Sequence, residues 1–142
     1  GGTHGDSVVY VVGNTSGAAA CNKKSPPWRH PPDCYPICLT MDRFAEIAAF
    51  ASRTSLRLAF GLNMGGDVQN VLDFLAAVAA RNVSVDTWEL GNELGITHIL
   101  DNGDAIAAAV ARLWPDPATR PLLAGPDDAG DGNDASRQEF AT

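Results

Sequence analysis

Three stretches of the chain repeat their apolar residues every three or four positions, which is the spacing of one face of an α-helix. The first follows Thr40, whose hydroxyl suits an N-cap, and it carries Asp42 in its first turn, where the helix dipole favours an anion. The third is predicted to begin at Asp104 and to stop at Pro115 and Pro117, because proline cannot continue a helix. The three apolar faces consist of Met41, Phe44, Ile47, Ala48 and Ala51; of Val68, Val71, Leu72, Leu75 and Val78; and of Ile106, Val110, Leu113 and Trp114.

Short, mostly apolar runs of strand length precede or separate these helices, at residues 7–12, 56–63, 85–93 and 122–127. Such alternation predicts an α/β fold with parallel strands and right-handed crossovers. A closed β/α barrel and an open doubly wound sheet both fit the order. A full barrel takes about 250 residues, so this chain would hold a partial (β/α)₈ TIM barrel of about three to four units. An open-sheet nucleotide-binding domain is disfavoured, because no Gly-x-Gly-x-x-Gly follows a strand.

The composition is that of an ordinary globular domain, with 45% hydrophobic and 19% charged residues in 142. The net charge of −7 argues against nucleic acid or an anionic membrane surface as partners. No apolar run approaches the roughly 18 residues of a transmembrane helix, and no signal peptide is visible. The chain begins Gly-Gly-Thr instead of with Met, so we expect a processed product or a piece of a longer protein.

All three cysteines lie in or beside a proline-rich stretch without periodicity, residues 13–39, which we interpret as a long surface loop. We expect one disulfide among Cys21, Cys34 and Cys38, which leaves one thiol without a partner in the chain. A zinc site made by these cysteines and His30 is the alternative, but the spacing lacks the CxxC pair that such sites usually contain.

Two glycosylation sequons begin at Asn14 and Asn82. Each sequon alone carries little weight, since the pattern also arises by chance. Together with the clustered cysteines, the sequons favour a secretory compartment, where disulfides persist and asparagine is glycosylated.

The run from Val85 to Glu93 is the stretch with the clearest candidate chemistry. It begins as a strand and ends in Gly-Asn-Glu, and ligands of parallel α/β folds bind at the carboxyl ends of strands. Glu93 there could give a proton to a leaving group while Asn92 hydrogen-bonds a substrate hydroxyl. The alternative is a polar strand end that merely starts a loop.

Several motifs occur in an order that resembles the heparanase-like enzymes of glycoside hydrolase family 79, particularly their plant and algal members. The resemblance covers residues 1–127, and Trp-Glu-Leu-Gly-Asn-Glu is its specific part. The motifs are Gly1-Gly2-Thr3 with Asp6, Cys38-Leu39-Thr40-Met41, Phe60-Gly61-Leu62-Asn63, Trp88-Glu89-Leu90-Gly91-Asn92-Glu93 and Gly125-Pro126-Asp127.

The resemblance implies an incomplete TIM-barrel domain over residues 1–142 and a retaining mechanism with two carboxyl groups about 5 Å apart. Glu93 matches the acid/base, and Asn92 the residue that hydrogen-bonds the sugar 2-hydroxyl. Asp6 matches a carboxylate of the glucuronide subsite, and Asn63 is expected to face the same cleft. Glu89 is interpreted as a structural group of the barrel interior. The implied partner is a uronic-acid glycan, with no cofactor and no metal, in an extracellular, cell-wall, lysosomal or vacuolar location or associated with a membrane.

The nucleophile of this family is a glutamate on a later strand. The remaining glutamates here, Glu46 and Glu139, do not follow a strand, so we expect the chain alone to be catalytically inactive. Two alternatives remain open: another retaining glycosidase of the same barrel clan, or a non-catalytic truncated product that binds sugar or a partner chain.

Overall fold

The computed structural model describes residues 8–13, 37–91 and 96–125, the last range without the side chains of residues 96–101. Strands and helices alternate over these ranges, and each described pair of strands is parallel, which confirms the predicted α/β class. The elements are β1 Val8–Val11, β2 Ile37–Thr40, α2 Met41–Arg53, β3 Ala59–Leu62, α3 Val68–Ala80, β4 Thr87–Leu90, α4 Ile96–Leu113 and β5 Leu122–Ala124.

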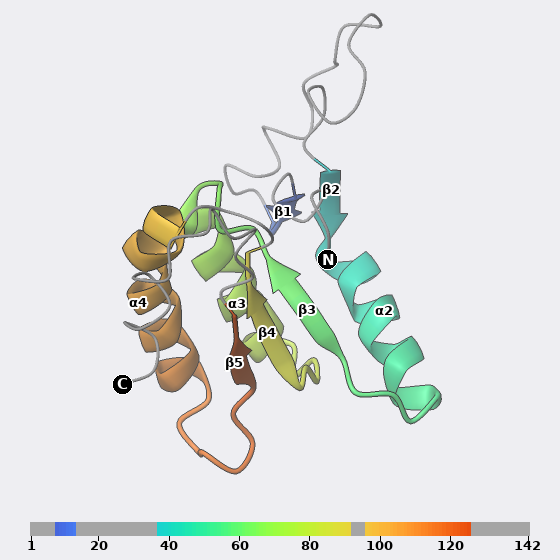
Figure 1. The fold of residues 1–142 in the computed structure, drawn as a ribbon. Helices are drawn as coiled ribbons and strands as arrows, with labels where there is room; N and C mark the ends of the chain where they lie inside the picture. The colour runs from blue at the N-terminus through green and yellow to red at the C-terminus, as the bar shows by residue number, and fades with distance from the viewer. Residues whose placement is uncertain (1–7, 14–36, 92–95, 126–142) are drawn as a thin grey trace, which may run out of the picture.

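The strands of the described ranges form two parallel sheets. β3, β4 and β5 pair in chain order, with Phe60, Trp88 and Leu123 level with one another. β1 pairs with β2 in a separate ladder, and Figure 1 shows this pair beyond the carboxyl end of β3. No ladder joins β2 to β3 within the described ranges, so the predicted partial barrel stays a prediction.

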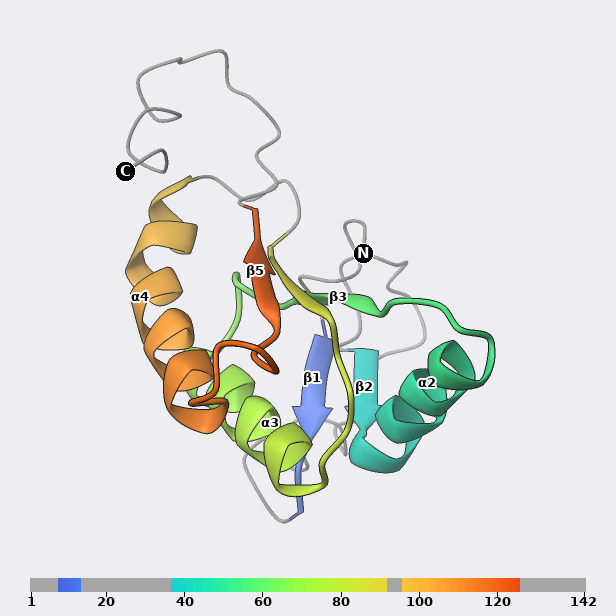
Figure 2. The same ribbon diagram turned by 90° about the horizontal axis from the view of Figure 1, so that it is seen from below.

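One face of the β3–β4–β5 sheet carries the helices and the core. Figures 1 and 2 show α2, α3 and α4 in a row on this side, with α3 between the other two. Trp88 on β4 is fully buried there and packs edge-on against Phe74 of α3 and Phe60 of β3. Phe44 of α2 completes the group, with its ring centroid 4.9 Å from those of Phe60 and Phe74. This aromatic cluster fixes the helices on the strands, since buried aromatic rings supply much of the apolar area of a core.

The helix starts show which predictions depended on local signals. Thr40 is the N-cap of α2, and its Oγ1 accepts a hydrogen bond from the Arg43 N–H at 3.2 Å, as predicted. The third helix begins at Ile96, so the prediction of a cap at Asp104 after a loop was wrong. Asn102, Gly103 and Asp104 lie inside α4 instead. Each costs about 1 kcal/mol or less in a helix interior, and tertiary contacts of α4 outweigh that cost.

The prediction of an uninterrupted loop over residues 13–39 was also wrong at its end. Residues 37–39 belong to β2, where Ile37 lies level with Val8 and Leu39 with Tyr10. A run of four residues has too little periodicity to predict as a strand, and its pairing partner is far away in the sequence.

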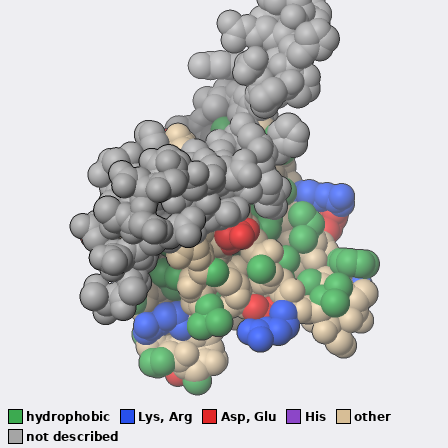
Figure 3. Space-filling model, in the orientation of Figure 1, with side chains coloured by type: hydrophobic (Ala, Val, Ile, Leu, Met, Phe, Trp, Pro, Cys, Tyr) green, Lys and Arg blue, Asp and Glu red, His purple; other side chains and the backbone are tan. Residues whose placement is uncertain are grey.

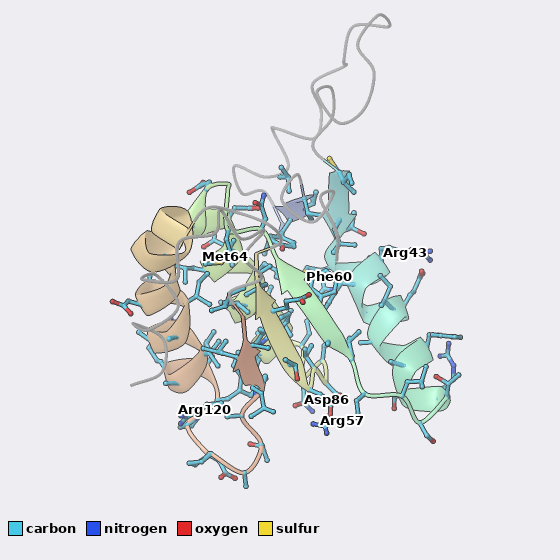
Figure 4. The ribbon with its side chains drawn as sticks, viewed as in Figure 1. Arg43, Arg57, Phe60, Met64, Asp86 and Arg120 are labelled. Atoms are coloured by element: carbon cyan, nitrogen blue, oxygen red, sulfur yellow. The ribbon has the colours of Figure 1, made fainter. Side chains whose placement is uncertain are left out.

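Asp86 joins the amino-terminal ends of β3 and β4. Its Oδ2 accepts from the Leu58 N–H at 2.8 Å, and its Oδ1 accepts from Arg57 Nε at 3.2 Å. Figure 4 shows Arg57 and Asp86 together at one end of the sheet and Met64 at the other. The carboxylate therefore aligns the two strands at the end away from the candidate chemistry.

Candidate functional site

The register of β3 and β4 brings their carboxyl ends to one edge. Leu62 lies level with Leu90, so Asn63 and Gly91 are the next residues at the same edge of the sheet. Gly91 is buried and has a φ of 74°, a conformation that residues with a Cβ rarely adopt. The glycine therefore lets the chain turn out of β4 immediately before Asn92 and Glu93.

Asn63 joins this edge to β1. Its side chain is only 8% exposed, and its Nδ2 donates to the Val8 carbonyl oxygen at 2.8 Å. Its backbone N–H donates to the Tyr10 hydroxyl at 3.0 Å, and its Oδ1 accepts from the Gly65 N–H at 3.1 Å. Asn63 was predicted to face a cleft. The structure gives it structural partners that leave one amide hydrogen and one lone pair of Oδ1 for any ligand.

Asn70 of α3 holds β1 from a second direction. Its Oδ1 accepts from the Tyr10 N–H at 2.9 Å, and its Nδ2 donates to the Tyr10 carbonyl oxygen at 2.8 Å. The Tyr10 ring stacks on Phe74, with centroids 4.1 Å apart and planes 10° from parallel. Sequence reasoning missed both Tyr10 and Asn70. The available signal was a polar residue on the apolar face of the second helix, four residues before Phe74.

Glu93, Asn92 and Asp6 lie outside the described residues. Chain connectivity nevertheless relates them to the edge, because consecutive Cα atoms are about 3.8 Å apart. Asn92 follows Gly91 directly, and Asp6 precedes Val8 by two residues. The nearest described residues are therefore Gly91 for Asn92 and Glu93, and Val8 for Asp6. The Asn63 side chain bonds Val8.

Glu89 lies on the opposite face of the sheet from the core. Trp88 and Leu90 are buried beneath the helices, whereas Glu89 is half-buried and points the other way by strand alternation. Its neighbours across the ladder are Gly61 and Ala124, which leave room beside its side chain. Among the described residues Glu89 has no hydrogen-bond or ion-pair partner, so its predicted structural role stays a prediction.

Charged pairs of the described surface lie away from the strand-end edge. Arg43 bonds Glu46 and Arg81 bonds Asp42, each at 2.7 Å between exposed side chains, and such pairs contribute little. On the face of the molecule in view in Figure 3, the basic side chains lie apart from one another and do not gather in one patch.

Neither a metal cluster nor a membrane span occurs in the part of the chain that the structure describes. These residues contain no group of three or more His, Cys, Asp or Glu arranged for a metal ion. Cys38 is disulfide-bonded, which favours the predicted bridge over the zinc alternative. None of the described helices combines the length and apolar character that crossing a membrane requires.

Of the two candidate glycosylation sites, Asn82 lies within the described residues and Asn14 does not. Asn82 is exposed in the turn after α3, with a φ of 52° and its N–H bonded to the Ala79 carbonyl. Asn14, Cys21 and Cys34 lie outside the described residues.

Comparison with known proteins identifies the family. Residues 1–127 match the model of the glycosyl hydrolase family 79 N-terminal domain. Heparanase-like protein 2 of Arabidopsis thaliana is 28% identical over 149 aligned positions, covering 89% of this chain and 27% of the relative. Heparanase-like protein 1 of the same plant is 29% identical over 138 positions, covering 78% of this chain and 21% of the relative. The chain thus spans about a quarter of the length of these relatives, and it belongs to glycosyl hydrolase family 79 as a heparanase-like member.

Proposed function

We propose that residues 1–142 form part of a (β/α)₈ barrel in a retaining glycosidase that cleaves β-glucuronides or glycans containing uronic acid. Family membership supports a glycosidase acting on carbohydrate. The observation that carries the finer proposal is the shared edge of Asn63 and Gly91, tied to Val8 by the Asn63 amide. That arrangement connects the segments that carry Asp6, Asn92 and Glu93.

Glu93 is assigned the role of general acid and base. It protonates the glycosidic oxygen as the bond to the leaving group breaks, and it then removes a proton from the water that attacks the glycosyl-enzyme. Asn92 hydrogen-bonds the sugar 2-hydroxyl, a contact that strengthens in the transition state. Asp6 borders the subsite for the uronic acid, and Asn63 holds β1 at the carboxyl end of β3 through its bond to Val8.

The nucleophile is not among these residues in our proposal. Glu46 is exposed on α2 and bonded to Arg43, and Glu89 lies within β4 instead of at its end. Without a second carboxylate about 5 Å from Glu93, no covalent intermediate forms. The 142-residue chain is therefore expected to hydrolyse no aryl β-glucuronide, either as it stands or as Glu93→Gln.

A chimera tests the role of Glu93 directly. Residues 1–127 would replace the matching segment of a heparanase-like relative, which supplies the remaining strands. We expect hydrolysis of aryl β-glucuronides, with Glu93→Gln lowering kcat/KM about 10²- to 10⁴-fold for a poor leaving group. The loss should be much smaller for a dinitrophenyl leaving group, which needs no proton.

Glu46→Gln is the matched control and should leave the rate unchanged. An equal loss of kcat/KM for good and poor leaving groups would refute the acid/base assignment. Turnover by the unmodified 142-residue chain that Glu93→Gln abolishes would instead show that a nucleophile lies within it or comes from a second copy. Activity of the chimera on neutral aryl glycosides but not on glucuronides would favour another glycosidase of the clan.

One observation favours a non-catalytic role as the second candidate. Leu122 on β5 is 61% exposed and points away from Trp88, whereas the described helices all lie on the Trp88 side of the β3–β4–β5 sheet. Parallel sheets are normally covered on both faces, so a partner chain could bind here. An inactive chimera, together with a stable complex between the chain and the remaining strands of a relative, would favour this candidate.

The secretory location remains part of the proposal. The disulfide at Cys38 and the exposed sequon at Asn82 are compatible with an extracellular, cell-wall, lysosomal or vacuolar site. A mobility shift on endoglycosidase treatment that Asn82→Gln reduces would support it.

A further inference from the structure

β1 is held by side-chain amides from two other elements. Asn70 of α3 bonds both backbone polar groups of Tyr10, at 2.9 and 2.8 Å. Asn63, at the end of β3, bonds the Val8 carbonyl at 2.8 Å and gives its own N–H to the Tyr10 hydroxyl at 3.0 Å. We call these three residues, Tyr10, Asn63 and Asn70, the β1 anchor.

The anchor specifies one position of β1. Asn70 presents an acceptor and a donor at once, and its amide satisfies both Tyr10 groups with the oxygen and the nitrogen of one side chain. Tyr10 and Asn70 are 0% and 7% exposed, and a buried polar group that loses its partner is costly. The stacking of Tyr10 on Phe74 fixes the ring, and the ring places the hydroxyl at Asn63. Backbone, ring and hydroxyl therefore constrain β1 together.

The anchor also connects two parts of the proposed site. Val8 is two residues from Asp6, and Asn63 lies beside Gly91, which directly precedes Asn92. A shift of β1 along α3 would change the separation between the uronic-acid subsite and the acid/base. Small displacements of this kind have large effects, because catalytic and binding groups must be held close to their working geometry.

We propose that Tyr10 and Asn70 are positioning residues that set the distance between the Asp6 segment and the strand end carrying Asn92 and Glu93. The inference rests on the proposed function, since it names what holds that site together. Neither residue touches the sugar. Both act through Asn63 and the backbone of β1.

The test uses the 142-residue chain with two conservative changes. Tyr10→Phe keeps the stacked ring and removes the hydroxyl, and Asn70→Asp keeps the shape and the acceptor but removes the donor to the Tyr10 carbonyl. Val78→Ala is the control: Val78 is fully buried on the same helix, about 12 Å along it from Asn70. The readouts are amide hydrogen exchange and binding of glucuronic acid by saturation-transfer NMR, well below each unfolding transition.

We expect Tyr10→Phe and Asn70→Asp to speed exchange about tenfold at Asn63, Gly65 and Val8–Val11. We expect both to weaken binding of glucuronic acid by about fivefold or more. Val78→Ala should destabilise the chain while leaving both readouts as in the unaltered protein. Binding unchanged in the two anchor variants would overturn the proposal, as would equal weakening in Val78→Ala.

A separate result would mark failure of the proposed function. If the unaltered chain binds no glucuronic acid, the sugar site is wrong, and exchange alone decides the positioning role. That role then stands only if the anchor variants, and not Val78→Ala, loosen Val8–Val11 and Asn63–Gly65 together. Loosening of one segment without the other would refute it.

Discussion

Replacing Gly66 by alanine provides a direct test of the packing around Asn63. A Cβ built on Gly66 would lie 2.6 Å from Asn63 Nδ2 and 3.1 Å from Asn63 Cγ, so one of the two groups must move. The Asn63 amide cannot rotate away freely, because it donates to the Val8 carbonyl at 2.8 Å and accepts from the Gly65 N–H at 3.1 Å. The methyl group is therefore expected to break at least one of these bonds.

The cost follows from the bonds that the methyl group breaks. Leaving a buried polar group without its partner costs about 1–3 kcal/mol, and we expect Gly66→Ala to lower the free energy of unfolding by that amount. Gly103→Ala is the matched control. Gly103 lies inside α4 with nothing within 4 Å of the added Cβ, so this change should raise the free energy of unfolding by about 0.5–1 kcal/mol through helix propensity.

Urea unfolding followed by circular dichroism measures both changes, and a double variant isolates the cause. Asn63→Ala removes the amide that the methyl group would meet, so Gly66→Ala should cost little more in that background. The coupling between the two changes should reach about 1–2 kcal/mol. Additive effects, or destabilisation by Gly103→Ala as large as that by Gly66→Ala, would refute the reasoning.

Three further predictions concern the Asp86 carboxylate that joins β3 to β4, the aromatic cluster and the disulfide. Asp86→Ala should lower the free energy of unfolding by about 1–3 kcal/mol, because the carboxylate bonds a backbone N–H at 2.8 Å; the same change at Asp42, whose side chain is 88% exposed, should cost less than about 1 kcal/mol. Phe74→Ala should cost about 3–5 kcal/mol in urea unfolding, and Phe50→Ala, at a position 57% exposed, much less; equal costs would contradict the cluster as the centre of the core. Under non-reducing, denaturing conditions alkylation should label one cysteine, and three after reduction, because Cys38 is disulfide-bonded; three labels without reduction would refute the bridge.

Local patterns predicted much of the fold. The N-cap at Thr40 and the buried faces of α2 and α3 follow from residues close together in the sequence, and the structure confirms them. The limits of α4 were harder to predict, because Asn102-Gly103-Asp104 has the composition of a helix start. Asn102 instead donates from within the helix to the Met64 carbonyl at 3.2 Å, a contact made across 38 residues.

The same distinction between local patterns and contacts far apart in the sequence applies to the candidate site. The Val85–Glu93 motif predicted a strand that ends before Asn92, and the register of β3 and β4 places Asn63 and Gly91 at that edge. The pairing of Asn70 with Tyr10 spans 60 residues and depends on where α3 lies against β1. A sequence pattern can mark Asn70 as a polar residue on an apolar face, but it contains no such distance, so the pairing of Asn70 with Tyr10 could not be predicted.

The Asn70 amide has a further consequence for the edge of β1. It offers the Tyr10 backbone one acceptor and one donor, the same pair that a neighbouring strand would offer. An exposed strand edge can recruit another chain and begin aggregation, but these two groups of β1 are already occupied by a side chain that cannot extend the ladder. A single amide on a helix thus stands in for a neighbouring strand at Tyr10 and satisfies two backbone groups that would otherwise be buried without partners.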